Sequence, residues 1–363
     1  MAIYLKKFEN HTQYENYING SEAILPNVSI CVTEGDVHYN PYTPPTPVET
    51  RVVAKYNVTS TSNPTRIGYR ASGFSAIEID GVEQPSVVSA YTFSTTGEHT
   101  VKYTLIDPTT IGSNSFRNCS CLTSIDIPNS VTSIGNEAFY YCSGLTNCTI
   151  GSGVTTIGNS TFYGCSSVTS IDIPSGVTSI GDYAFSNCNS LTSITVDSDN
   201  VNYSSDEGVL FNKAKTTLIR VPIGNSRTSY NIPNSVTTIG ESAFYGCTSL
   251  TSIDIPSGVT SIGDYAFSNC NSLTSINIPS GVTSIGINVF YNCTSLTSVT
   301  IPDSVTSIGN NAFQYCESLA SITIPSGVTL IGYYAFDHCE ILTSITIPSG
   351  VTWIGESAFS NCI

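Results

Sequence analysis

A 23-residue unit determines the organisation of this sequence. Residues 255–277 read IPSGVTSIGDYAFSNCNSLTSIN, and the same string recurs with small changes through most of the 363-residue chain. Ten phenylalanines mark the recurrence, and each is followed three positions later by a cysteine. Successive phenylalanines are 23 residues apart except between Phe185 and Phe244, where the separation is 59. Spacing this regular predicts stacked structural repeats rather than separate globular domains.

Each repeat contains two extended segments and one turn. The apolar residues of 273–278 alternate toward their end and are followed by Pro279, which suits a strand with one buried face. Residues 282–285 form a second short extended piece that ends at Gly286. Residues 264–270 are predicted to form a short helical or 3₁₀ turn. A single unit cannot bury its apolar residues, so we predict a β-rich repeat solenoid.

These residues carry a family resemblance. The pattern L-x-x-I-x-I-P-x-x-V-x-x-I-G-x-x-A-F-x-x-C resembles the BspA-like (Treponema-type) leucine-rich repeat over roughly residues 111–363. The resemblance implies a curved, right-handed leucine-rich-repeat solenoid. Such solenoids are found mainly in bacterial surface proteins that bind host proteins or other cells. The resemblance implies no catalytic residues.

The chain is predicted to have four parts. The solenoid spans residues 109–363 and contains an expanded repeat at 197–230, in which residues 209–211 and 217–221 read as a β-hairpin. Residues 51–108 read as a small all-β module that caps the first rung of the solenoid. The Pro-rich stretch 41–50 reads as a stiff linker. Residues 1–40 form an N-terminal segment, for which weak helical spacing at 8–18 predicts a helix.

Composition excludes several classes of function. The net charge is −15, which argues against nucleic-acid binding because that needs a basic face. No apolar run reaches the roughly 18 residues of a membrane span, and the first residues do not read as a signal peptide. The last residue falls in mid-repeat, so we expect an uncapped C-terminal end that favours self-association.

The sequence offers no chemistry for catalysis. No nucleophile elbow, phosphate loop or dinucleotide fingerprint is present, so we predict no enzyme activity, no catalytic residue and no cofactor. Zinc-ligand spacings are missing, and residues 197–200 resemble a calcium loop only in part because Val201 stands where a ligand is needed, so no metal site is predicted. The repeating cysteines are predicted to be buried free thiols, with isolated disulfides as the alternative. The four histidines are scattered, at His11, His38, His99 and His338.

Two groups of residues are candidates for binding. The first is the residue between the two isoleucines of each repeat strand, which should point to solvent and which the resemblance places on the concave face. We call these residues the strand column: Asp126, Asp172, Asn231, Asp254, Asn277, Thr300, Thr323 and Thr346. The second group is a contact loop in the expanded repeat, made of Lys213, Lys215, Arg220 and Arg227. Repeated tyrosines beside the A-F-x-x-C segment indicate either an aromatic ridge or packing between rungs.

The functional prediction is a non-enzymatic, adhesin-like leucine-rich-repeat protein. Its partner would be a protein or a cell-surface ligand, and the family resemblance implies an extracellular or cell-surface location. The alternative is a phage or prophage structural protein, associated with the virion, that displays the solenoid on a tail or capsid appendage.

Overall fold

The computed structural model describes residues 4–8, 28–32, 50–69 and 73–362. The chain forms two compact units, Met1–Glu49 and Thr50–Ile363. In the first unit, strands β1 (Tyr4–Phe8) and β2 (Val28–Val32) pair in parallel. Apart from Phe8 and Thr50, the predicted helix at 8–18 and the predicted linker at 41–50 lie outside the described residues.

The second unit begins with a small group of strands. Strand β3 lies between β8 and the first strand of the repeats, and its side chains alternate between buried and more exposed. The strands are β3 (Val52–Val58), β4 (Thr65–Arg66), β5 (Phe74–Ile79), β6 (Val82–Glu83), β7 (Ala90–Tyr91) and β8 (Gly97–Leu105).

Strand β3 also covers the edge of the first repeat strand. It pairs antiparallel with β10 (Leu122–Asp126), so that Ala54 lies opposite Ile125. The two regions share a core, in which the ring of Tyr103 packs edge-on against Phe116, the first phenylalanine of the repeats. The backbone groups on this edge of β10 are therefore paired within the chain rather than open to another one.

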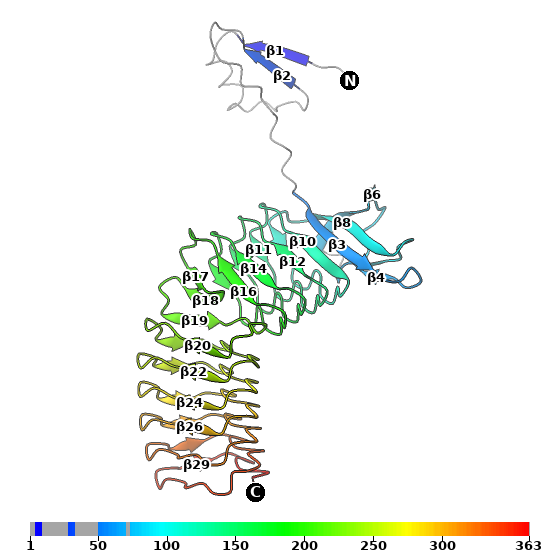
Figure 1. Ribbon diagram of the computed structural model, residues 1–363. Helices are drawn as coiled ribbons and strands as arrows, with labels where there is room; N and C mark the ends of the chain where they lie inside the picture. Colours follow the sequence, from blue (N-terminus) through cyan, green and yellow to red (C-terminus); the bar gives the residue numbers. More distant parts are fainter. Residues whose placement is uncertain (1–3, 9–27, 33–49, 70–72, 363) are drawn as a thin grey trace. The chain divides into compact units, whose positions relative to one another are not determined.

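The repeats build two ladders of short strands (Figure 1). Pairing within a ladder is parallel, and the register advances by one repeat, as in Ser275 opposite Ser298. The first ladder contains β10, β12 (Asn147–Thr149), β14 (Ser170–Ile173), β16 (Ser193–Val196), β20 (Ser229–Asn231), β22 (Ser252–Asp254), β24 (Ser275–Asn277) and β26 (Ser298–Thr300). The second contains β9 (Thr110–Ile111), β11 (Ser133–Ile134), β13 (Thr156–Ile157), β15 (Ser179–Ile180), β21 (Thr238–Ile239), β23 (Ser261–Ile262), β25 (Ser284–Ile285), β27 (Ser307–Ile308), β28 (Leu330–Ile331) and β29 (Trp353–Ile354). The predicted β-rich solenoid of leucine-rich repeats is confirmed.

The segment that closes each repeat consists of consecutive tight turns rather than a helix. The amide of Cys119 donates to the carbonyl of Phe116 at 3.1 Å, as in the predicted 3₁₀ turn. However, Asn114 and Asn118 have positive φ angles of 63° and 59°, which interrupt any helix. The amide of Phe116 instead donates to the carbonyl of Ala138 in the next rung. Backbone hydrogen bonds therefore join neighbouring rungs on this face too, and no α-helix is present in the described part of the chain.

Phenylalanine and cysteine fill the centre of every regular rung. The rings stack between rungs, and those of Phe267 and Phe290 have centroids 5.6 Å apart and planes 8° apart. The thiol of Cys270 donates to the carbonyl oxygen of Phe244, one rung back, at 3.1 Å. The twelve cysteines from Cys119 to Cys362 are all unbridged, as predicted for the thiols of the repeats. Burial raises the pKa of Cys142 to about 12, so this thiol stays protonated at neutral pH.

The expanded repeat interrupts the stack. Strands β17 (Tyr203–Asp206), β18 (Val209–Asn212) and β19 (Thr217–Arg220) pair antiparallel in that order, and β19 then pairs in parallel with β21. The buried core also divides at β18, because Leu210 belongs to the cluster that begins at Val52 and Phe211 to the cluster that continues to Ala358. The solenoid thus has two cores that meet at this hairpin.

Candidate functional site

All members of the strand column are exposed. The isoleucines on either side of Asn277, Ile276 and Ile278, are buried, as the alternation of a strand predicts. Pairing in register places column members side by side on successive rungs, as with Asn231 opposite Asp254 and Asn277 opposite Thr300. The column is therefore a continuous row of small polar side chains over β20–β26.

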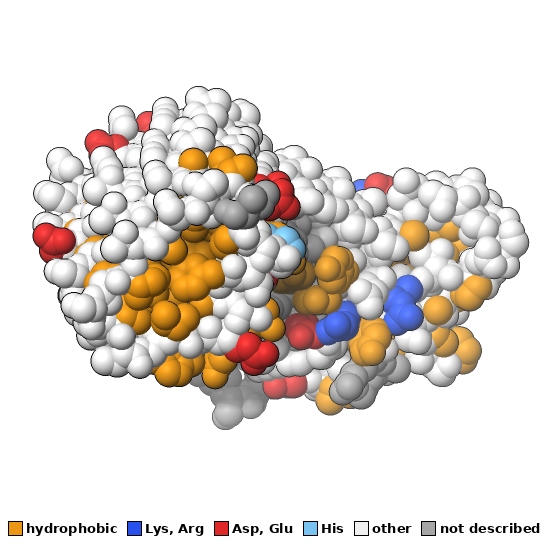
Figure 2. Space-filling model, turned by 90° about the horizontal axis from the view of Figure 1, so that it is seen from below, with side chains coloured by type: hydrophobic (Ala, Val, Ile, Leu, Met, Phe, Trp, Pro, Cys, Tyr) orange, Lys and Arg blue, Asp and Glu red, His pale blue; other side chains and the backbone are white. Residues whose placement is uncertain are grey.

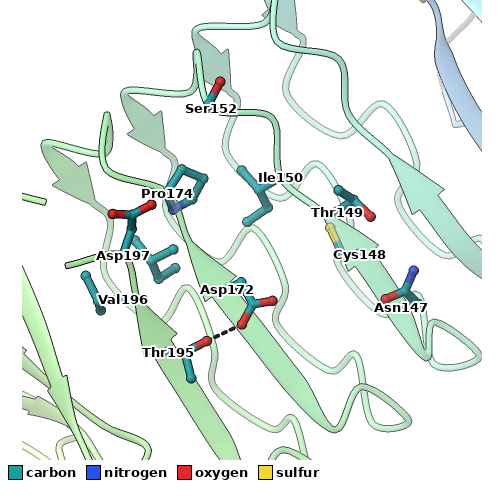
Figure 3. Close-up of a pocket in the computed structure, with 11 residues that line it drawn as sticks. Asn147, Cys148, Thr149, Ile150, Ser152, Asp172, Pro174, Thr195, Val196 and Asp197 are labelled. Carbon is teal, nitrogen blue, oxygen red and sulfur yellow. Dashed lines mark hydrogen bonds between the residues drawn. The ribbon is translucent and has the colours of Figure 1, made fainter. Parts of the chain in front are cut away.

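A hollow of about 500 Å³ lies on the same face, between β12 and the end of β16 (Figure 3). Asp172 occupies its middle, with Thr149 on one side and Thr195 on the other. Apolar side chains and polar groups both contribute to its wall. The lining residues are Asn147, Cys148, Thr149, Ile150, Ser152, Asp172, Ile173, Pro174, Thr195, Val196 and Asp197.

Two departures from the repeat flank this hollow. The proline that ends the other repeat strands is replaced by Gly151 after β12 and by Asp197 after β16. A Cβ atom at Gly151 would lie 2.6 Å from the carbonyl oxygen of Pro128. Only a glycine therefore lets this rung pack so closely against the preceding one. In agreement, β12 pairs with β10 but not with β14, and β14 pairs only with β16. The hollow lies at this break in the ladder.

The hollow holds two carboxylates. Asp172 accepts a hydrogen bond from the hydroxyl of Thr195, and Asp197 accepts one from the backbone amide of Asp199 at 2.9 Å. Both carboxylates are exposed, and neither forms an ion pair with any residue that the structure describes. Of the lining residues, the sequence placed Asp172 in the strand column but did not place Asp197 or Ser152 in a binding site on this face. The two missing prolines were the signal that could have found them.

The predicted contact loop does not form one cationic surface. Lys215 pairs with Asp206 at 2.7 Å and Arg227 pairs with Glu207 at 3.0 Å, so local carboxylates neutralise both. Lys213 is exposed and donates to the carbonyl oxygen of Ser198 at 3.1 Å. Arg220 is only 5% exposed and does not contribute to the surface.

Arg220 instead fills the core at the irregular rung. Its guanidinium donates from Nη1 to the carbonyl of Ser242 and from Nη2 to the carbonyl of Tyr245. Burial lowers the pKa of Arg220, while nearby thiols, including Cys247 and Cys188, act in the opposite sense. Arg220 therefore interacts electrostatically with Cys188 of the repeat before the irregular rung and with Cys247 of the repeat after it.

Other side chains offer less for binding. The described residues contain no group of three or more histidine, cysteine, aspartate or glutamate side chains that could hold a metal ion. No helix in the described residues is long and apolar enough to cross a membrane. The rings of Tyr140 and Tyr163 stack with centroids 4.9 Å apart, and Arg117 lies over Tyr140 at 4.2 Å. These two tyrosines pack between rungs while remaining partly exposed.

Large apolar side chains are exposed toward the last rungs, where Figure 2 shows apolar atoms gathered among polar ones. These residues are Leu330, Tyr333, Tyr334, Ile341, Ile347, Trp353 and Ile354. Self-association at this end stays a prediction.

Comparisons with known proteins agree with this architecture. Residues 109–227, 223–341 and 283–363 match a family described as the BspA type leucine-rich repeat region. A leucine-rich repeat protein from Eubacterium ventriosum is similar, with a TM-score of 0.59 and 29% identity over 70% of this chain and 80% of its own. A leucine-rich cell surface protein from Faecalibacterium prausnitzii has a TM-score of 0.53 and 35% identity over 68% and 78%. No curated protein matches the sequence.

Proposed function

Because this chain belongs to the BspA-type leucine-rich-repeat family, we propose that it is a non-enzymatic, adhesin-like protein of the cell surface, which binds a protein ligand through the face that carries the strand column. Proteins of leucine-rich repeats generally bind other proteins. The similar protein from Faecalibacterium prausnitzii is described as a cell surface protein, which supports this location. The alternative of a virion appendage has no support among these matches.

The continuous polar row of the strand column carries this proposal. Small exposed side chains on successive rungs leave a surface that an extended partner can follow over several repeats. The column has no tyrosine, tryptophan or arginine, the residues that usually anchor tight interfaces. We therefore expect modest affinity at each rung, with strength gained from contact at several rungs.

Charge indicates the kind of partner. Residues 109–363 contain 16 acidic and five basic residues, and residues 228–363 contain eight acidic and no basic ones. A partner surface rich in lysine or arginine would complement this field and associate faster at low salt. The ligand is thus expected to be a protein with a basic surface.

A peptide-display selection against the immobilised full chain tests the proposal. Binders are re-measured by interferometry against the double variant Asn277→Arg with Thr300→Arg, which places bulk and positive charge on the strand column. The matched control is Ser261→Arg with Ser284→Arg, two exposed residues of the second ladder. We expect the affinity of the selected peptides to fall at least about tenfold for the first variant and to change little for the control. Equal loss in both, or loss only in the control, would overturn the proposal.

A further inference from the structure

We propose that the hollow between β12 and β16 is a receptor for one basic side chain, a lysine or arginine presented by the protein partner. This inference rests on the proposed function and assigns it an anchoring point. The hollow differs from the stretch β20–β26 of the strand-column face, where successive rungs are paired in parallel and the exposed column residues are small polar side chains.

The charge of the hollow favours a cation. Asp172 and Asp197 come from neighbouring rungs and both line it. Thr195 engages one oxygen of Asp172, and the amide of Asp199 engages one oxygen of Asp197, so each carboxylate keeps a second oxygen for a ligand. Neither has a positively charged partner within the described residues. A basic side chain would supply the missing charge.

The neutral groups of the hollow fit the same occupant. Lysine and arginine carry only hydrogen-bond donors at their tips, and Asn147, Thr149 and Ser152 offer further oxygen acceptors in the wall. Ile150, Ile173, Pro174 and Val196 supply apolar surface. The methylene stem of a long basic side chain can pack on such surface while its charged tip reaches a carboxylate. A hollow of about 500 Å³ has room for both parts.

A basic side chain of the chain itself that reaches the backbone next to Asp197 is engaged elsewhere. Lys213, in the expanded repeat, donates to the carbonyl oxygen of Ser198, the residue that follows Asp197. Its amine therefore lies close to the rim but bonds to the backbone rather than to either carboxylate. This leaves the hollow open to a side chain from another molecule.

Fluorescence anisotropy with the full-length chain tests this inference. The probe is a fluorescein-labelled peptide of alternating serine and arginine, compared with a lysine peptide and with one in which citrulline replaces arginine. Citrulline keeps the shape of arginine but has no charge. We expect the arginine or the lysine probe to bind at least about tenfold more tightly than the citrulline probe at about 0.05 M salt.

The matched variants separate the hollow from general attraction. Asp172→Asn with Asp197→Asn should lower the affinity for the basic probe about tenfold or more. Asp303→Asn with Glu317→Gln removes the same net charge from exposed residues outside both the hollow and the strand column, and it should leave binding nearly unchanged. Equal effects from both pairs would reveal non-specific attraction and overturn the inference. Thr149→Trp, which fills the hollow without changing charge, should also abolish binding.

The outcomes also distinguish this inference from the proposed function. If selected binders lose affinity on the strand-column variant but not on Asp172→Asn with Asp197→Asn, the function stands and the anchor fails. If the basic probe needs the two aspartates while selected binders ignore the strand column, the anchor stands and the function fails. Binding of calcium alone to the hollow in place of the peptide would also overturn the inference.

Discussion

The hydroxyl of Tyr183 donates a hydrogen bond to the carboxylate of Glu241, which lies 58 residues further along the chain. Tyr183 belongs to the last regular repeat before the hairpin and Glu241 to the first regular repeat after it. The bond therefore spans the expanded repeat, where the buried core divides in two. It is a direct side-chain connection between the regular repeats on either side of the expanded one.

Removal of this hydroxyl should weaken that junction. Tyr183→Phe is expected to lower the free energy of unfolding by about 1 kcal/mol, because a hydrogen bond to a charged but exposed group contributes modestly. Denaturant titration measures the change. Tyr265→Phe is the matched control, since Tyr265 occupies the same position of a regular repeat with a similar positive φ angle. A larger loss in the control would contradict the role of Tyr183.

The fit of the third rung against the second depends on a glycine. A Cβ atom at Gly153 would lie 2.0 Å from the carbonyl oxygen of Asn129, whereas at the equivalent Gly258 it would lie 3.9 Å from that of Asn234. Gly153→Ala should therefore destabilise the chain by about 2 kcal/mol or more through overpacking. Gly258→Ala should be neutral or stabilising by up to about 1 kcal/mol. Thermal unfolding of both variants distinguishes these expectations, and equal effects would contradict them.

The buried Arg220 should be sensitive to the length of the side chain that replaces it. Arg220→Ala leaves a void and removes the donors to two buried carbonyls, so a cost of about 4 kcal/mol is expected. Arg220→Met keeps the apolar stem and should cost about half as much. Lys213→Ala, at an exposed position of the same hairpin, should change stability by less than about 0.5 kcal/mol. Denaturant midpoints that rank methionine below alanine would contradict this account.

His99 should make stability depend on pH. Its Nδ1 lies 2.6 Å from Asp80 Oδ2 and its Nε2 lies 2.9 Å from the carbonyl oxygen of Thr95, so both ring nitrogens face acceptors. Burial acts to lower the pKa of His99, but the hydrogen bonds and the charge of Asp80 outweigh it and raise the pKa. The protonated ring is therefore the form that this geometry favours.

The sign of the effect follows from that raised pKa. The stabilisation is fully present below the unfolded pKa of about 6.5 and is lost as pH rises through the higher folded value. The stability difference between the natural chain and His99→Gln should therefore be larger at about pH 5.5 than at about pH 8.5. NMR titration of the ring should give a midpoint above that of a free histidine. A midpoint below it would contradict the prediction.

Most of the fold can be predicted from the repeats. The 23-residue spacing of phenylalanine and cysteine predicts the stacking, and the alternation beside Asn277 predicts which side chains are exposed. The turn conformation was harder to predict, because the residue types at Asn114 and Asn118 do not by themselves indicate a left-handed backbone. Their conformation depends on hydrogen bonds to the next rung, in which the amides of Asn114 and Asn118 donate to the carbonyls of Asn136 and Tyr140.

The site was predictable in part. Asp172 stands out from sequence because it is a charged member of an exposed column. The hollow around it depends on how closely Gly151 approaches Pro128, which is a property of two rungs rather than of either alone. The prediction that Arg220 belongs to a surface contact loop was wrong. A basic residue in a variable segment suggests a surface position, but Arg220 is buried and its guanidinium donates to two backbone carbonyls.

The register between regular rungs has a consequence for how such a chain changes in length. Ser275 faces Ser298 through the same kind of contact that joins Ser284 to Ser307, so each rung presents its successor with nearly the surface that it receives. A duplication or deletion of one 23-residue unit in the gene would then join two surfaces that already match. The number of rungs, and with it the length of the solenoid, can vary between related chains without any new interface having to arise.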